Sequence, residues 1–153
     1  MLYLRVAPED LAELERDPDV AGQWFADREP LDLGTAWHAI HFLLNGSAFG
    51  GGSPLFDAVL GGTAIGDPST YEPIRYVSPA EVAAVAAALV KSPELTQRFT
   101  HRAMQQAEIY PESAWAEPAV LTELVLPAYE RLLALFAGAA AAGDAVLITL
   151  DRR

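Results

Sequence analysis

The sequence predicts a single α+β domain with a small mixed or antiparallel sheet of about three to four short strands, packed by several helices. Three observations lead to this fold class. Helical patterns outnumber strand patterns, the strand patterns lie far apart along the chain, and 153 residues suffice for one hydrophobic core. We therefore interpret residues 1–153 as one domain.

A strand followed by a helix is predicted at the start of the chain. Leu2–Val6 is apolar and β-prone, whereas Pro8 suits the first position of a helix, and the acidic residues after it suit the positive end of the helix dipole. A second helical region follows around Val20–Asp27. The stretch TAWHAIHFLLNG (Thr35–Gly46) then predicts a third helix, which ends at Gly46 in a left-handed cap.

The glycine-rich segment GSAFGGGSPLFDAVLGG (46–62) invites comparison with nucleotide-binding loops. A phosphate-binding P-loop ends in Gly-Lys-Ser/Thr, but Lys91 is the only lysine and lies elsewhere. A dinucleotide fingerprint and a nucleophile elbow would both need glycine where the chain has Leu55. We interpret the segment as a connection containing a short helix, with Ser53 placed to cap its start and Gly61–Gly62 closing it.

The strand-and-helix pattern of the N-terminus returns in the middle of the chain. Ile74–Val77 predicts a strand, and Ser78 and Glu81 have the spacing of a capping box with Pro79 in the first turn. Setting YLRVAPEDLAEL beside IRYVSPAEVAAV matches the strand, the proline and the first apolar helical position. Two strand–proline–helix units are therefore expected, although one short match is weak support for an internal duplication.

The C-terminal third is predicted to be helical until the last strand. Apolar residues recur at helical spacing from Leu121 to Ala139, and Pro127 should kink this helix or divide it in two. Gly143 and Asp144 end the helical pattern. Ala145–Leu150 (AVLITL) is the clearest strand pattern in the chain.

Charge excludes one large class of function. The formal net charge is −11, and residues 1–32 carry nine acidic residues against three arginines. This field repels phosphate backbones, and no basic patch with interleaved aromatics appears, so we expect no nucleic-acid binding. A basic protein partner would be favoured electrostatically, whereas the plainer interpretation is an acidic face that keeps the protein soluble.

The absence of cysteine excludes disulfides, thiolate catalysis, Cys-ligated zinc and iron–sulfur clusters. We expect no cofactor and a reducing compartment, with the cytoplasm as the default. The first residues lack the apolar core of a signal peptide. The longest apolar run, Leu132–Ala142, is too short to span a bilayer, so no membrane association is expected.

His38 and His41 form an H-x-x-H pair in the third predicted helix. Zinc sites on one helix more often use H-E-x-x-H, and here Ala39 and Ile40 lie between the histidines, with no acid in the turn. His101 could join them only through the fold. We therefore expect no metal site and interpret the imidazoles as packed groups with backbone partners.

Helical spacing predicts different environments for the two histidines. Trp37, His41 and Leu44 are expected on the buried face of the helix, with His38 at its edge and exposed.

Further along, EIYPESAW (108–115) combines acids with two large aromatics that could line a ligand or partner surface, although such rings more often pin a loop onto the core. The candidate residues for a pocket or partner surface are Trp37, His41, Tyr71, Tyr76, Tyr110 and Trp115.

Several segments together resemble the YfbM-like family, bacterial proteins whose defining domain has no known function. The matching pieces occur in the family's order and are YLRVAPEDL, AWHAIHFLLNG, PLFDAVLGG, YEPIRYVSPAEVAAVAAAL, IYPESAW and AAAGDAVLITL. In the family pattern the recurring elements correspond to Trp37, His41 with Phe42, and Gly46, whereas position 38 is not restricted to histidine. The resemblance implies a single α+β domain and supplies no mechanism.

Three functions compete on this evidence. The first is a non-catalytic domain that binds a protein or a small ligand, since no catalytic residue is marked by its neighbours. The second is a small hydrolase that uses His41 in a cleft, which requires an exposed His41 within reach of an acid. The third is a homo-oligomeric structural subunit joined through its C-terminal helices.

Overall fold

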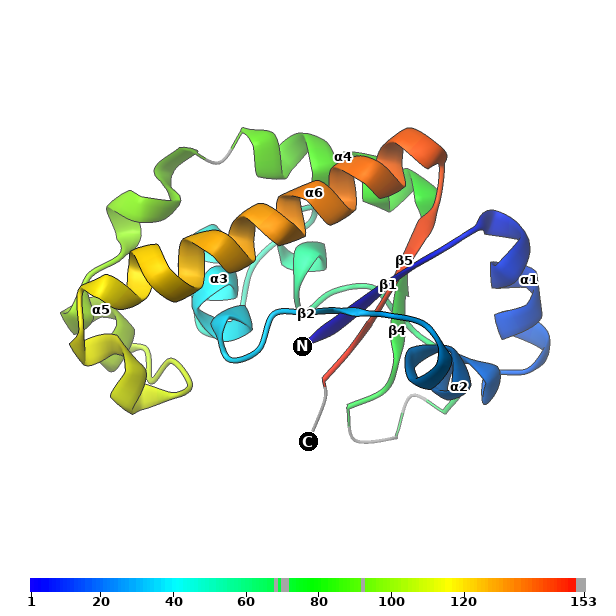
Figure 1. Cartoon of the computed structure of the whole chain (residues 1–153), viewed down its shortest axis with the longest axis horizontal. Coiled ribbons are helices and arrows are strands. Elements are labelled where there is room, and N and C mark those ends of the chain that lie inside the picture. Colours follow the sequence, from blue (N-terminus) through cyan, green and yellow to red (C-terminus); the bar gives the residue numbers. More distant parts are fainter. Residues whose placement is uncertain (68, 70–71, 92, 151–153) are drawn as a thin grey trace.

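The computed structural model describes residues 1–67, 69, 72–91 and 93–150, which form a five-stranded sheet with helices on both faces (Figure 1). The strands are β1 (Leu2–Val6), β2 (Leu31–Asp32), β3 (Thr63–Ala64), β4 (Arg75–Val77) and β5 (Ala145–Thr149). The α-helices are α1 (Pro8–Arg16), α2 (Val20–Asp27), α3 (Ala36–Asn45), α4 (Pro79–Val90), α5 (His101–Gln106) and α6 (Leu126–Ala142). Shorter helical turns are the 3₁₀ segments Phe56–Ala58, Pro93–Arg98 and Glu112–Ala116 and a π-helical turn over Leu121–Val125.

β5 is the central strand of the sheet, whose order is β2-β1-β5-β4-β3. It pairs with β1 on one side, where Leu2 lies opposite Thr149, and with β4 on the other, where Val77 lies opposite Val146. Every neighbouring pair is antiparallel, so the predicted α+β class is confirmed with an antiparallel sheet. The sheet exceeds the expected number of strands because β2 and β3, of two residues each, are too short to show an alternating pattern.

Both faces of β5 are buried because helices cover the sheet on two sides. Val146 and Ile148 belong to the larger core cluster, with residues of α3, α4 and α6, whereas Ala145 and Leu147 belong to a smaller cluster with α1 and α2. Figure 1 shows α1 and α2 on one side of the strands, with α4 and α6 running together on the other. Among the helices of the larger cluster, α3 carries the candidate site.

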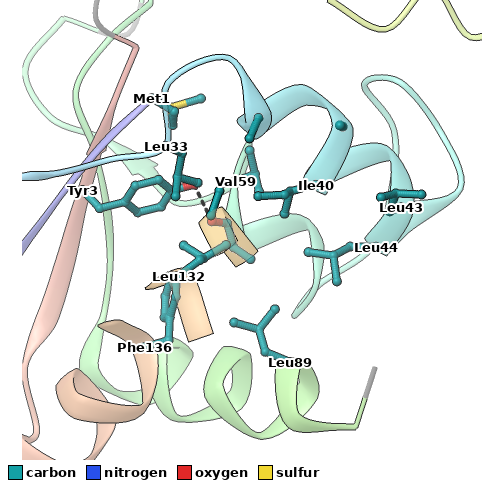
Figure 2. Packing of buried hydrophobic residues seen from close by; sticks show 14 of the residues in the cluster. Met1, Tyr3, Leu33, Ile40, Leu43, Leu44, Val59, Leu89, Leu132 and Phe136 are labelled. Carbon is teal, nitrogen blue, oxygen red and sulfur yellow. Dashed lines mark hydrogen bonds between the residues drawn. The ribbon is translucent and has the colours of Figure 1, made fainter. Parts of the chain in front are cut away.

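Tyr3 of β1 anchors the larger cluster to the sheet. Its ring is fully buried and meets the edge of Phe136 with 6.3 Å between the ring centroids. Its hydroxyl donates a 2.9 Å hydrogen bond to the carbonyl of Ala58, and Figure 2 shows Tyr3 and Phe136 in one interior with Ile40 and Leu89. Burial raises the pKa of the Tyr3 phenol above its ordinary value, so the group stays neutral and keeps donating.

Both predicted strand–proline–helix units are present. Pro8 and Pro79 lie in the first turns of α1 and α4. The backbone N–H of Ser78 donates to the Glu81 carboxylate at 2.8 Å, and the Glu81 N–H donates to Ser78 Oγ at 3.3 Å, which completes the capping box. The helices nevertheless cover opposite faces of the sheet, since α1 packs in the smaller cluster and α4 in the larger. The shared local pattern does not extend to tertiary packing.

The C-terminal helical region changes from π-helical to α-helical geometry just before Pro127. A π-helical turn over Leu121–Val125 runs directly into α6, and Pro127, which has no N–H to donate, lies in the first turn of α6. α6 ends at Gly143, whose φ of 73° is left-handed. The proline therefore lies next to a local change of helix geometry, within a helical stretch that runs from Leu121 to Ala142.

Leu121–Ala142 is the one stretch of the described residues that is long and apolar enough to cross a membrane, judged by length and composition alone. Of its most apolar window, 28% is buried. Its buried side chains, which include Leu132 and Phe136, join the larger cluster beside α4 and β5. In the structure one side of this stretch packs into the hydrophobic core.

The helix expected over 53–60 is wrong in extent. Only Phe56–Ala58 is helical, as a single 3₁₀ turn, and Ser53 makes no capping hydrogen bond. The N–H groups of Leu60 and Gly61 both donate to the carbonyl of Phe56, at 3.0 Å each, so the chain turns back at once. The side chains at the end of this turn are buried in the core. The segment therefore packs there as a short turn and does not extend into a longer helix.

Candidate functional site

The candidate site lies along α3, where Trp37, His38 and His41 occupy neighbouring turns. Gly46 ends the helix with a left-handed φ of 70°, as predicted. The Arg98 side chain donates to the carbonyls of Leu43 and Leu44 at 3.0 and 3.1 Å, so the last turn of α3 is tied to the segment before α5. The helix is therefore a rigid base for the side chains it carries.

His38 is buried, and the prediction that it is exposed at the edge of α3 is wrong. Only 1% of its surface is accessible, whereas Trp37, predicted to be buried, is half-buried. The physical reason is that the loop after α3 and the loop at Tyr110 cover the edge of α3 and contact the His38 ring from two sides. Helical periodicity in the sequence indicates one buried face of the helix. It does not show whether loops cover another face.

The two ring nitrogens of His38 join these loops. Nε2 donates to the carbonyl of Ala48 at 2.9 Å, and Nδ1 accepts from the backbone N–H of Tyr110 at 2.9 Å. Because a backbone N–H can only donate, Nδ1 carries no proton, and the ring is the neutral Nε2–H tautomer. Burial lowers the pKa of His38, while the bond to Ala48 opposes this shift. The net lowering of the pKa and the N–H donated to Nδ1 favour a fixed, uncharged imidazole at neutral pH.

Two aromatic side chains contact this imidazole, and the backbone of a third aromatic residue, Tyr110, binds it. The Trp37 ring stacks on His38 with centroids 4.8 Å apart and an interplanar angle of 15°, and Phe49 lies over it at 4.7 Å and 38°. Phe49 is 66% exposed and Tyr110 is 56% exposed. We call Trp37, Phe49 and Tyr110 the aromatic patch. Large apolar side chains exposed together are typical of ligand or partner sites.

Two adjoining hollows border Trp37, and we call them together the Trp37 groove. The first has a volume of about 390 Å³ and the second about 240 Å³. Both are lined by Met1, Trp37 and Leu150. The first is also lined by Asp32, Gly34, Thr35 and Tyr110, and the second by Phe49, Leu60, Glu72, Pro73 and Arg75.

Charged groups of both signs line the groove. The Asp32 carboxylate lies 3.8 Å from the amino group of Met1. Arg75 donates from Nη1 to the carbonyl of Gly61 at 2.6 Å and from Nη2 to that of Val59 at 3.1 Å. Burial lowers the pKa of the Arg75 guanidinium, which nevertheless stays protonated. The groove thus combines aromatic walls with a fixed guanidinium.

His41 lies outside the groove. It has no accessible surface, and its Nε2 donates to the carbonyl of Gly50 at 2.9 Å. Asn45 Nδ2 approaches its Nδ1 at 3.4 Å, and Phe56 meets the ring edge-on at 5.6 Å. Burial lowers the pKa of His41. The exposure and the nearby acid that a general base would need are not found among the described residues.

The remaining predicted site residues do not converge on the groove. Tyr76 lines a separate hollow of about 140 Å³ beside α1. Trp115 is buried, and its indole N–H donates to the carbonyl of Ile109 at 2.8 Å, so it pins the Pro-containing loop onto the core. Tyr71 lies outside the described residues. Of the predicted set, the structure brings together Trp37 and Tyr110.

Four groups of the site were not among the predicted residues: His38, Phe49, Asp32 and Arg75. Phe49 carried a usable signal, because a lone large aromatic within a glycine-rich loop has little local reason to be buried. Arg75 lies in an apolar strand and gave no such signal. Within the described residues, no group of three His, Cys, Asp or Glu side chains could hold a metal ion.

Comparisons with known proteins agree on the fold. The structure is similar to that of YfbM from Escherichia coli, a protein of unknown function, with a TM-score of 0.75 and 22% sequence identity over 98% of this chain and 100% of that one. No curated protein matches the sequence. The model of a domain of unknown function, DUF1877, matches residues 1–149. The chain therefore belongs to the DUF1877 family, as the resemblance to YfbM-like proteins indicated.

Proposed function

We propose that the chain is a non-catalytic binding protein whose Trp37 groove takes a small ligand with a flat apolar part. One observation carries the proposal: Trp37 stacks on a buried His38, Phe49 packs against the same ring at a tilt, and this ring is hydrogen-bonded on both sides. These contacts hold the aromatic patch in place before a ligand arrives. Binding then costs little side-chain entropy, which favours affinity.

The groove's size and chemistry support this proposal. The larger hollow, of about 390 Å³, falls in the range of small-molecule pockets, and the smaller one adjoins it. Neither hollow is lined by a histidine, and the ring nitrogens of His38 are both occupied by backbone groups. A groove without a free imidazole suits recognition better than acid–base catalysis.

A basic protein partner is the second candidate, and the charge of the chain favours it. The net charge of −11 would attract such a partner, and Phe49 and Tyr110 are exposed enough to meet a protein surface. Association of this kind should weaken as salt is raised. We also propose a bacterial, cytoplasmic setting, in keeping with a chain that has no cysteine.

Saturation-transfer NMR with a library of small aromatic fragments tests the first proposal. Phe49→Ala removes one wall of the groove, and Val90→Ala is the matched control, because Val90 is 70% exposed at the end of α4 and lines neither hollow. We expect fragments that bind the wild type and Val90→Ala and lose their signal with Phe49→Ala. A library in which no fragment distinguishes the two variants would contradict the proposal.

A further inference from the structure

Arg75 supplies the groove with a positive charge that has no carboxylate within ion-pair distance in the described part of the chain. Among the residues the structure describes, none of the ion pairs within 4.0 Å involves Arg75. Its two hydrogen bonds go to the uncharged carbonyls of Gly61 and Val59. A guanidinium has more N–H donors than these two bonds use, so donors remain for a ligand.

The surrounding backbone fixes the position of this guanidinium. Arg75 lies on β4, and the carbonyls it contacts belong to the turn that leads into β3, the neighbouring strand. Gly62 in that turn has a φ of 92°, and a β-carbon there would lie 2.8 Å from the Tyr76 carbonyl, so the turn is held close to β4. A donor group fixed in this way needs little reorganisation to meet an anion.

The hollow beside Arg75 is otherwise mainly apolar. Trp37 and Phe49 form aromatic walls, and Leu60 and Pro73 add aliphatic surface. The amino group of Met1 and the carboxylate of Glu72 are the other charged groups among the described residues that line this hollow. Because the whole chain carries a net charge of −11, a bare anion gains little from the long-range field. A ligand must therefore combine an anionic group with an apolar body.

From this juxtaposition we infer that the ligand of the Trp37 groove is a carboxylic acid with an aromatic or aliphatic body. Its carboxylate binds the remaining N–H donors of Arg75, for which a planar fork is well suited. Its body packs against Trp37 and Phe49. This inference rests on the proposed function, because it assigns a ligand class to the same groove.

Matched probes test the inference on the unaltered protein. 3-Phenylpropionate and 3-phenylpropionamide share the apolar body and differ in charge, and their affinities can be compared by NMR titration near neutral pH. We expect the carboxylate to bind about tenfold more tightly than the amide, because hydrogen bonds to an ionised acceptor are roughly twice as strong. The carboxylate alone should shift the Arg75 Nε–H resonance of ¹⁵N-labelled protein.

The outcomes separate this inference from the proposed function. Equal affinities for the two probes, both lost with Phe49→Ala, would overturn the carboxylate assignment and leave the binding groove standing. If neither probe binds in a Phe49-dependent way, both ideas fall. Arg75→Lys keeps the charge and loses the fork, so it should reduce the preference for the carboxylate, whereas Arg131→Lys, exposed on α6, should not.

Because Arg75 also supports the turn at Gly61, Arg75→Lys needs a second readout. Binding of 3-phenylpropionamide should be retained in this variant, which shows that the groove is intact. A carboxylate preference that persists unchanged in a folded Arg75→Lys protein would contradict the inference. If that variant does not fold, the affinity ratio and the Arg75 Nε–H shift of the wild type decide.

Discussion

The backbone N–H of Tyr110 donates a 2.9 Å hydrogen bond to Nδ1 of His38, across 72 positions of the sequence. The opposite nitrogen of the same ring binds the carbonyl of Ala48. One imidazole thus ties α3 to two loops, each of which presents a residue of the aromatic patch. The position of that patch depends on a buried side chain beneath it.

Replacing His38 with phenylalanine keeps a stacked ring and removes both hydrogen bonds. We expect the free energy of unfolding to fall by about 1–3 kcal/mol, because a partly buried N–H and a partly buried carbonyl lose their partner. Hydrogen exchange at the Tyr110 amide should accelerate. Urea unfolding and amide exchange measure both effects. His101→Phe is the control, since it removes one bond from an exposed residue, and an equal loss in both variants would argue against a special role.

Stability should increase with pH in the range immediately below the ordinary histidine pKa of about 6.5. Burial lowers the pKa of His38 and of His41 below the ordinary value of about 6.5. In this range the unfolded chain binds protons that the folded chain does not, so the free energy of unfolding rises with pH. As pH falls, this contribution to stability is lost. Urea midpoints at constant ionic strength test this. A midpoint that stays constant or rises on acidification would contradict it.

Two serines that both resemble helix caps should respond differently to alanine. Ser78→Ala removes a capping bond to α4 and should cost about 0.5–2 kcal/mol. Ser53 makes no capping bond, so Ser53→Ala should cost less than about 0.5 kcal/mol. Thermal unfolding of the two variants gives the comparison directly. Equal costs would mean that the 3₁₀ turn at Phe56 is capped in solution.

Tyr3→Phe should destabilise the chain by about 1–3 kcal/mol, because the buried carbonyl of Ala58 loses its donor. The control is Tyr129→Phe, which removes a 2.8 Å bond to the Leu89 carbonyl from a half-buried ring that water can reach. Urea unfolding should show the smaller loss for the control. In an alkaline titration, the Tyr3 phenol should ionise only when the protein unfolds, since burial raises its pKa. Ionisation in the folded state would contradict the buried bond.

Local sequence signals predicted the parts of the fold that depend on neighbours in the chain. The capping box of Ser78 and Glu81 and the left-handed cap at Gly46 each need only a few adjacent residues. α2, over Val20–Asp27, also falls where its pattern placed it. The two-residue strands were missed because so short a segment has no periodicity, and tertiary pairing alone defines it.

The candidate site was only partly predictable, because it is assembled from distant segments. Trp37 and Tyr110 were identified as amphipathic aromatics, and both line the groove. The spacing within α3 pointed to His41 instead of His38, because it could not show which loops cover the helix. Arg75 acquires its place in the groove through the pairing of β4 with β5, which no local pattern reveals.

The central place of β5 also affects how the chain can fold during synthesis. β1 and β4 do not pair with each other, and both need β5, the last strand to leave the ribosome. Until Ala145–Thr149 emerges, each has an open edge, and the contacts between Leu2 and Thr149 span nearly the whole sequence. Completion of the sheet is therefore a late, non-local step, of the kind that slows folding. A nascent chain stalled before Ala145 would expose two open strand edges to aggregation.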